Sequence, residues 1–181
     1  PEDVFALQNN TASNVGWLTV MYGSLNDGGR GDYEIRSPFF DMFEAGDLRA
    51  GFQGAADMDD SYTHEDVFEM YYYGVGNINN YGGINTIKWG NYYTNLPMIR
   101  LAEMYVTRAE ASFETGNTAQ ALADINTIRA RAGLTTPLTA VTQDIIRMER
   151  YKELCWEGFR LHDLKRWHQN VGSLAYDSWN L

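Results

Sequence analysis

The fold is decided by residues 96–134, LPMIRLAEMYVTRAEASFETGNTAQALADINTIRARAGL, which read as two helices joined by a tight turn. Apolar residues recur every three or four positions, the spacing that places them on one face of a helix. The first helix would bury Ile99, Ala102, Val106, Ala109 and Phe113, and the second Ala121, Leu122, Ile125, Ile128 and Ala132.

Local signals mark the ends of these helices. Pro97 is expected in the first turn of the first helix, and Thr115-Gly116 at its end. Asn117 is the expected N-cap of the second helix, Gln120 could complete a capping box, and Gly133 ends the helix. The two helices would form an antiparallel hairpin like one tetratricopeptide repeat, a unit that cannot bury both of its faces alone.

A third helix is expected after Thr142, running through Met148, Cys155 and Phe159, with Gly158 bending or interrupting it. Residues 1–96 differ from this part, because they hold 13 of the 17 glycines and 17 of the 25 aromatic residues. Short strands or brief helices are expected there at 4–7 and 84–89. We predict a mainly α fold with a tetratricopeptide-like hairpin core and a loop-rich, partly β or irregular N-terminal half. Residues 1–95 would pack on residues 96–181 as one compact domain.

Charge and cysteine content exclude several classes of protein. The net charge of −10 lies in residues 1–96, which hold fourteen acidic and four basic residues. Nucleic acids require clustered Lys and Arg, so we expect no nucleic-acid partner, and a neutral ligand suits this surface better than an anionic one. The single cysteine, Cys155, excludes an intramolecular disulfide and is expected to be a small buried hydrophobe.

Three motifs occur in order along the C-terminal half: residues 96–111, residues 121–134, and residues 146–167 with Glu157-Gly158-Phe159-Arg160 followed by Asp163-Leu164-Lys165-Arg166-Trp167. In this order and spacing they resemble the C-terminal helices of the SusD/RagB family of nutrient-binding outer-membrane lipoproteins. Residues 4–8 and 46–49 resemble weaker landmarks of the same family.

The resemblance implies non-catalytic capture of oligosaccharides or other nutrients at the cell surface, for delivery to a SusC-like TonB-dependent transporter. It implies a location on the extracellular face of the outer membrane. The sequence contains no phosphate-loop or dinucleotide-binding motif, so we expect no cofactor. The N-terminal helical repeats, the signal peptide and the lipidated cysteine of the family are not in this sequence. We therefore expect a C-terminal fragment of a longer protein, with the lipid anchor in the missing N-terminal part.

Six charged residues of the third motif stand at helical spacing: Glu149, Arg150, Glu153, Glu157, Arg160 and Asp163. They could form a solvated helix face with ion pairs of about 0.2–0.5 kcal/mol each. The resemblance instead favours a structural charge network, which would matter for stability rather than for ligand affinity. A catalytic carboxylate pair is a third interpretation, but adjacent turns of one helix rarely place two carboxyl groups across a scissile bond. We expect no catalytic residue.

Aromatic residues beside Gly, Asn and Asp are the candidate ligand contacts, because a sugar ring can stack on an aromatic face. The six substrate-binding candidates are Trp17, Tyr22, Tyr33, Tyr62, Tyr72 and Tyr81. Others, such as Trp89, are expected in the local core.

Two further functions and one metal site remain as alternatives. The chain could be a repeat-type adaptor that binds protein partners through its helices, or a glycan-processing enzyme. Residues 57–65 alternate oxygen-bearing side chains like a calcium loop, but Tyr62 and Phe68 stand where an EF-hand requires Gly and Glu. The histidines are isolated along the sequence, so we expect no metal site.

Overall fold

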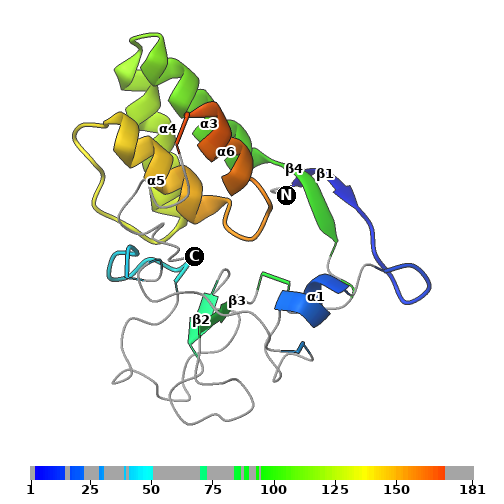
Figure 1. Ribbon diagram of the computed structural model, residues 1–181. Coiled ribbons are helices and arrows are strands. Elements are labelled where there is room, and N and C mark those ends of the chain that lie inside the picture. Colours follow the sequence, from blue (N-terminus) through cyan, green and yellow to red (C-terminus); the bar gives the residue numbers. More distant parts are fainter. Residues whose placement is uncertain are drawn as a thin grey trace.

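A stack of helices forms one side of the molecule, and short strands with an isolated helix form the other (Figure 1). The structure is a computed structural model that describes residues 3–14, 17–22, 29–30, 39, 41–50, 70–72, 84–86, 88–89, 93 and 95–169. Its elements are β1 (Asp3–Leu7), α1 (Trp17–Tyr22), β2 (Met70–Tyr72), β3 (Ile84–Thr86), β4 (Leu96–Arg100), α3 (Leu101–Glu114), α4 (Thr118–Arg131), α5 (Gln143–Glu153) and α6 (Arg160–Arg166). The predicted mainly α fold is confirmed.

The predicted hairpin is formed by α3 and α4. Ala109 of α3 and Ala121 of α4 are fully buried. They belong to one apolar cluster with Ile125, which is also on α4, and with Ile146 of α5. Because these alanines are small, the helix backbones can approach closely. A single repeat would leave one apolar face of its hairpin exposed. Within the described residues, α5 covers this face through the cluster.

The turn of the hairpin follows the predicted local signals. Gly116 has a φ of +84°, which glycine adopts without steric cost. The Asn117 side chain accepts a hydrogen bond from the backbone N–H of Gln120 at 3.3 Å, as an N-cap should. The Gln120 side chain donates to Asp124 at 2.9 Å instead of reaching back to Asn117, so the capping box is half formed.

The predicted start of the first helix is wrong. Residues 96–100 form β4, which pairs antiparallel with β1 and places Ala6 opposite Pro97 and Phe5 opposite Ile99. A two-stranded sheet has edges on which the missing N–H of proline is tolerated, so Pro97 fits a strand as well as a first helical turn. The helix begins at Leu101, after Arg100 in an extended conformation.

The third predicted helix begins where expected but ends early. Thr142 caps α5 by accepting a hydrogen bond from the N–H of Ile145 at 3.3 Å. The helix ends at Glu153, and a turn through residues 154–158 leads to α6, with Trp156 at φ +65° and Gly158 at φ +81°. Glu157 therefore comes from a turn and not from a helix face. Cys155 is buried, as predicted.

Residues 41–50 of the N-terminal half pack against the helices. The backbone N–H of Leu48 donates to the carbonyl of Ala132 at 2.9 Å, just past the end of α4. Phe39, Phe43 and Ala50 form a buried cluster with Cys155. β2 pairs with β3 as a second two-stranded sheet. The division at residues 95 and 96 stays a prediction, since β1 and β4 pair across it.

We expect Gly133→Ala to be more destabilising than Gly116→Ala. Both glycines have φ near +84°, where an alanine costs about 1–2 kcal/mol. A Cβ at position 133 would also lie 2.9 Å from Cγ of Leu48 and 3.1 Å from the carbonyl oxygen of Gly46, whereas a Cβ at position 116 meets nothing within 4 Å. Urea denaturation should show a loss of about 2–3 kcal/mol for Gly133→Ala. Equal losses for the two variants would contradict the observed packing of residues 46–48.

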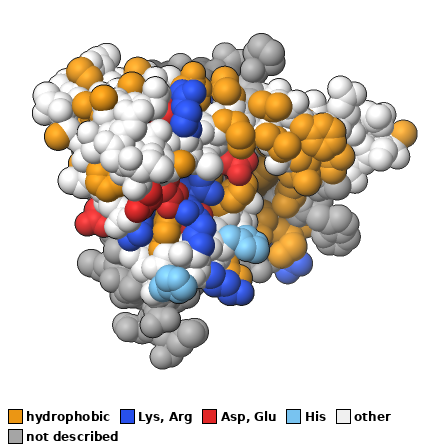
Figure 2. Space-filling view, turned by 90° about the horizontal axis from the view of Figure 1, so that it is seen from above, with side chains coloured by type: hydrophobic (Ala, Val, Ile, Leu, Met, Phe, Trp, Pro, Cys, Tyr) orange, Lys and Arg blue, Asp and Glu red, His pale blue; other side chains and the backbone are white. Residues whose placement is uncertain are grey.

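Apolar side chains are exposed on the side of the molecule that carries β1 and β4 (Figure 2). Those exposed on these strands and on the first turn of α3 are Val4, Phe5, Leu7, Met98, Ile99, Leu101 and Met104. In the part of the chain that the structure describes, no helix has the length and apolar character needed to cross a membrane.

Candidate functional site: an aromatic cavity beside a buried charge network

The charge network begins at Arg49, whose side chain is fully buried between two parts of the chain. Its guanidinium donates to both carboxylate oxygens of Asp47, at 2.9 and 2.7 Å, and to Glu149 on α5 at 2.9 Å. Glu153 lies 3.6 Å from another nitrogen of the same group. Burial lowers the pKa of Arg49, but the hydrogen bonds with Asp47 and the charges of Glu149 and Glu153 raise it above its ordinary value. This group therefore stays cationic at every accessible pH.

Glu149 and Glu153 connect this centre to other cations. Arg129 of α4 donates to Glu149 at 3.0 Å and to Glu44 at 2.5 Å, and Arg131 donates to Glu153 at 2.5 Å. Hydrogen bonding with Arg129 lowers the pKa of Glu44, although partial burial opposes the shift. The network thus fastens residues 44–49 to α4 and α5.

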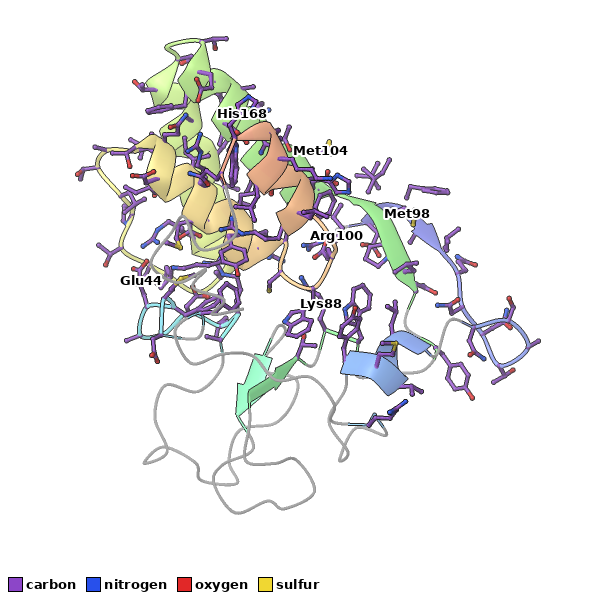
Figure 3. The ribbon with its side chains drawn as sticks, viewed as in Figure 1. Glu44, Lys88, Met98, Arg100, Met104 and His168 are labelled. Carbon is purple, nitrogen blue, oxygen red and sulfur yellow. The ribbon has the colours of Figure 1, made fainter. Side chains whose placement is uncertain are left out.

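A second set of contacts centres on Glu157. Its carboxylate accepts from Nζ of Lys88 at 2.5 Å and from Arg100 at 2.6 and 3.1 Å. Lys88 and Arg100 lie close together beside the turn between α5 and α6 (Figure 3). Lys88 also donates to the backbone carbonyl of Cys155 at 2.9 Å. These contacts hold the 154–158 turn against β4.

The other three residues of the predicted network, Arg150, Asp163 and Arg160, make contacts of their own. Arg150 donates through Nε to both carboxylate oxygens of Asp163, at 3.0 and 2.9 Å, and so joins α5 to α6. Arg160 stacks over the ring of Tyr151, with its guanidinium carbon 4.0 Å from the ring centroid. Arg150 therefore pairs with a residue thirteen positions away, and not with Glu153 on the same helix. A role of these residues in stability rather than affinity stays a prediction.

A cavity of about 420 Å³ lies between α1, β4 and the turn that follows α5. Thr19 positions α1 there, because its hydroxyl donates to the backbone carbonyl of Trp89. The apolar lining is provided by Leu18, Tyr22, Trp89, Leu96, Pro97, Met98, Trp156 and Phe159, and the charged lining by Arg100, Glu103 and Glu157.

Trp156 is the most constrained residue of this lining. Its φ of +65° is unusual for a bulky side chain and costs on the order of 1–3 kcal/mol. Two contacts support the conformation: the indole N–H of Trp89 donates to the carbonyl of Trp156 at 3.3 Å, and the ring of Tyr22 meets the Trp156 ring edge-on at 5.3 Å. Such strain is found at ligand-binding positions, where the surrounding structure holds it in place.

Glu103 differs electrostatically from the other charged residues of the lining. It lies in the first turn of α3 and is half-buried. Burial raises the pKa of its carboxyl, which the charges of Arg150 and Arg100 lower and those of Glu157 and Asp163 raise. Within the described residues its carboxylate has no hydrogen bond or ion pair.

Of the six predicted aromatic contacts, the structure places Tyr22 in the lining of the cavity. Trp17 and Tyr72 belong to α1 and β2, but their side chains lie outside the described residues. Tyr33, Tyr62, Tyr81 and the calcium-like residues 57–65 also lie outside them. No group of three or more His, Cys, Asp or Glu side chains in the described ranges could hold a metal ion.

Sequence reasoning missed Trp156, Phe159, Arg100 and Glu103 as lining residues, and it assigned Trp89 to the core. Trp89 is buried at 4% exposure, yet it is also one of the residues that line the cavity. All of these except Trp89 stand within or beside the motifs that carry the family resemblance. One sequence signal could have indicated a lining residue: Trp156 stands directly before Glu157-Gly158, where the helix was expected to bend.

The comparison with protein families confirms the resemblance. The model of the SusD family matches residues 17–180. The chain belongs to the SusD family. A curated relative, the starch-binding protein SusD of Bacteroides thetaiotaomicron, is 38% identical over an alignment of 97 positions, which covers 46% of this chain and 17% of the relative.

Solved structures agree with this assignment. A SusD-like protein from Bacteroides fragilis is 25% identical with a TM-score of 0.65, over 92% of this chain and 43% of that chain. A SusD-like carbohydrate binding protein from Bacteroides vulgatus is 21% identical with a TM-score of 0.63, over 93% of this chain and 35% of that one, and shows the shared fold. This SusD-family chain therefore spans less than half the length of these relatives.

Proposed function

We propose that this chain takes part in the non-catalytic capture of oligosaccharides, with the aromatic cavity as a contact site. The observation that carries the proposal is a cavity lined by Tyr22, Trp89, Trp156 and Phe159 in a chain of the SusD family. A relative bears the name starch-binding protein, and a similar structure the name carbohydrate binding protein. Both names support a glycan as the class of ligand.

The size and lining of the cavity suit a short segment of a glycan. Its volume of about 420 Å³ falls within the range of about 300–1,000 Å³ of small-molecule sites. Each aromatic stacking contact contributes about 0.5–1.5 kcal/mol beyond area burial, and we assume a comparable gain for a sugar face. After ordering costs, two or three such contacts together with a few hydrogen bonds leave a dissociation constant of roughly 10 μM to several mM.

The family resemblance also supports a partner and a location. We propose that the captured glycan passes to a SusC-like TonB-dependent transporter, on the extracellular face of the outer membrane. A large TonB-dependent barrel encoded directly beside this gene would support that partner. Co-purification with such a barrel from solubilised outer membranes would test it, and recovery of the protein in the cytosolic fraction would contradict it.

Trp156→Gly should lower the affinity for neutral oligosaccharides about tenfold or more, which corresponds to about 1.4 kcal/mol. Glycine keeps the turn, because it adopts a φ of +65° without strain. The measurement is titration calorimetry with maltohexaose, cellohexaose and xylohexaose.

The matched control is Trp167→Ala, which removes a tryptophan that is absent from the lining and hydrogen-bonds to Glu110. It should leave affinity unchanged. Equal affinities of the Trp156→Gly variant and the unaltered chain would contradict the proposed site. New reducing ends after incubation with the same glycans would contradict the non-catalytic assignment.

The adaptor alternative has one observation in its favour, the apolar side chains exposed on β1, β4 and the start of α3. An adaptor would bind a protein through this face and would show no glycan titration. Substituting Phe5 and Ile99 with serine separates the two functions, because both are exposed on this face and absent from the cavity lining. Glycan affinity should therefore be retained in the proposed function.

A further inference from the structure

The charged residues in the cavity lining are not equally available to a ligand. Arg100 donates to Glu157 at 2.6 and 3.1 Å and to the backbone carbonyl of Glu153 at 3.0 Å. Glu157 in turn accepts from both Arg100 and Lys88. These groups neutralise one another and hold the wall of the cavity together. Their hydrogen-bonding capacity is directed into the protein.

Glu103 has the opposite character. Its half-buried carboxylate lines the cavity, and among the described residues it makes no hydrogen bond or ion pair. The two cations that act on it electrostatically are already engaged, Arg150 with Asp163 and Arg100 with Glu157. A carboxylate that has lost part of its hydration gains more than an exposed one when a ligand supplies hydrogen-bond donors.

We infer that Glu103 is a specificity-determining residue of the cavity, whose carboxylate accepts hydrogen bonds from adjacent hydroxyl groups of a neutral sugar. The inference rests on the proposed glycan-binding function. Hydroxyl groups donate strongly to an ionised acceptor, and the neighbouring aromatic rings cover the apolar face of the sugar. The same negative charge repels uronic acids and sulfated sugars, because Glu103 lacks a paired cation among the described residues, whereas Glu157 is paired with Arg100 and Lys88.

The test is Glu103→Gln, which keeps the shape of the side chain and removes its charge. Titration calorimetry with a neutral oligosaccharide that binds the unaltered chain, and with a sulfated form of it, should show two changes. The affinity for the neutral sugar falls about tenfold, the loss expected for a hydrogen bond to a charged group. The preference for the neutral over the sulfated form also becomes smaller.

Glu114→Gln is the matched control. Glu114 lies on the same helix, is exposed, and is absent from the cavity lining. This variant should keep both the affinity and the preference of the unaltered chain. A thermal melt of each variant verifies that the fold is retained.

The pH dependence of binding gives an independent readout. Ligand hydroxyls bind best to the ionised carboxylate, so affinity should fall as the pH drops through the pKa of Glu103. Burial raises that pKa above its ordinary value of 4.5. The charges of Glu157 and Asp163 also raise it, and those of Arg150 and Arg100 lower it. The Glu103→Gln variant should lack this fall.

Each result bears differently on the two proposals. If Glu103→Gln binds both sugars like the unaltered chain while Trp156→Gly loses affinity, the role of Glu103 is overturned and the glycan site stands. Stronger binding of an amine-bearing oligosaccharide such as chitosan hexamer, abolished by Glu103→Gln, would overturn the assignment to neutral sugars. If no oligosaccharide binds the unaltered chain, both proposals are overturned.

Discussion

Replacing Arg49 with methionine should lower the free energy of unfolding by about 3–5 kcal/mol, the usual result of removing one partner from a buried ion pair. Arg49 is fully buried and donates to Asp47 and Glu149, with Glu153 3.6 Å away. Methionine approximates the volume of the arginine stem but leaves these carboxylates without their shared cation. Urea denaturation followed by circular dichroism gives the free energy directly.

Lys165→Met is the matched control for the loss of one positive charge. Lys165 is exposed on α6 and has no ion pair within the described part of the chain. Its replacement should change the free energy of unfolding by less than about 0.5 kcal/mol. If Arg49→Met were as mild as this control, the network would behave like exposed ion pairs, which contribute about 0–1 kcal/mol.

Ile125→Ala should destabilise the chain by about 2–5 kcal/mol, because it opens a cavity in the contact between the hairpin and α5. Ile125 is fully buried with Ala109, Ala121 and Ile146, and two of these neighbours are alanines too small to fill the space. Ile125→Val removes a single methylene and should cost about 0.5–1.5 kcal/mol. Equal effects of the two variants would mean that the helices collapse onto the gap.

Features that depend on a few neighbouring residues could be predicted from the sequence. The turn at Gly116, the caps at Asn117 and Thr142, and the stop at Gly133 all occur where predicted. Each expresses a local backbone requirement, such as a positive φ or an unpaired N–H. The apolar spacing of α4 likewise places Ile125 and Ile128 in the core.

Features that depend on distant partners could not be predicted. Pro97 is compatible with both a strand and a helix start, and the pairing with β1, more than ninety residues earlier, decides between them. Likewise, Arg49 stands 100 residues before Glu149, and nothing near either residue identifies the other as its partner. The cavity combines α1, residue 89, β4 and the 156–159 turn, so its lining follows from tertiary packing and not from any one motif.

The pairing of β1 with β4 has a consequence for the order of folding. It joins Asp3 to Arg100, whereas the hairpin of α3 and α4 joins residues close in sequence. Local contacts form quickly, while closing a loop of this length first requires a loss of chain entropy. On a ribosome β1 emerges before its partner strand, which is made more than ninety residues later. The helical hairpin should therefore form early, and β1, although made before the hairpin, should pair with β4 only later.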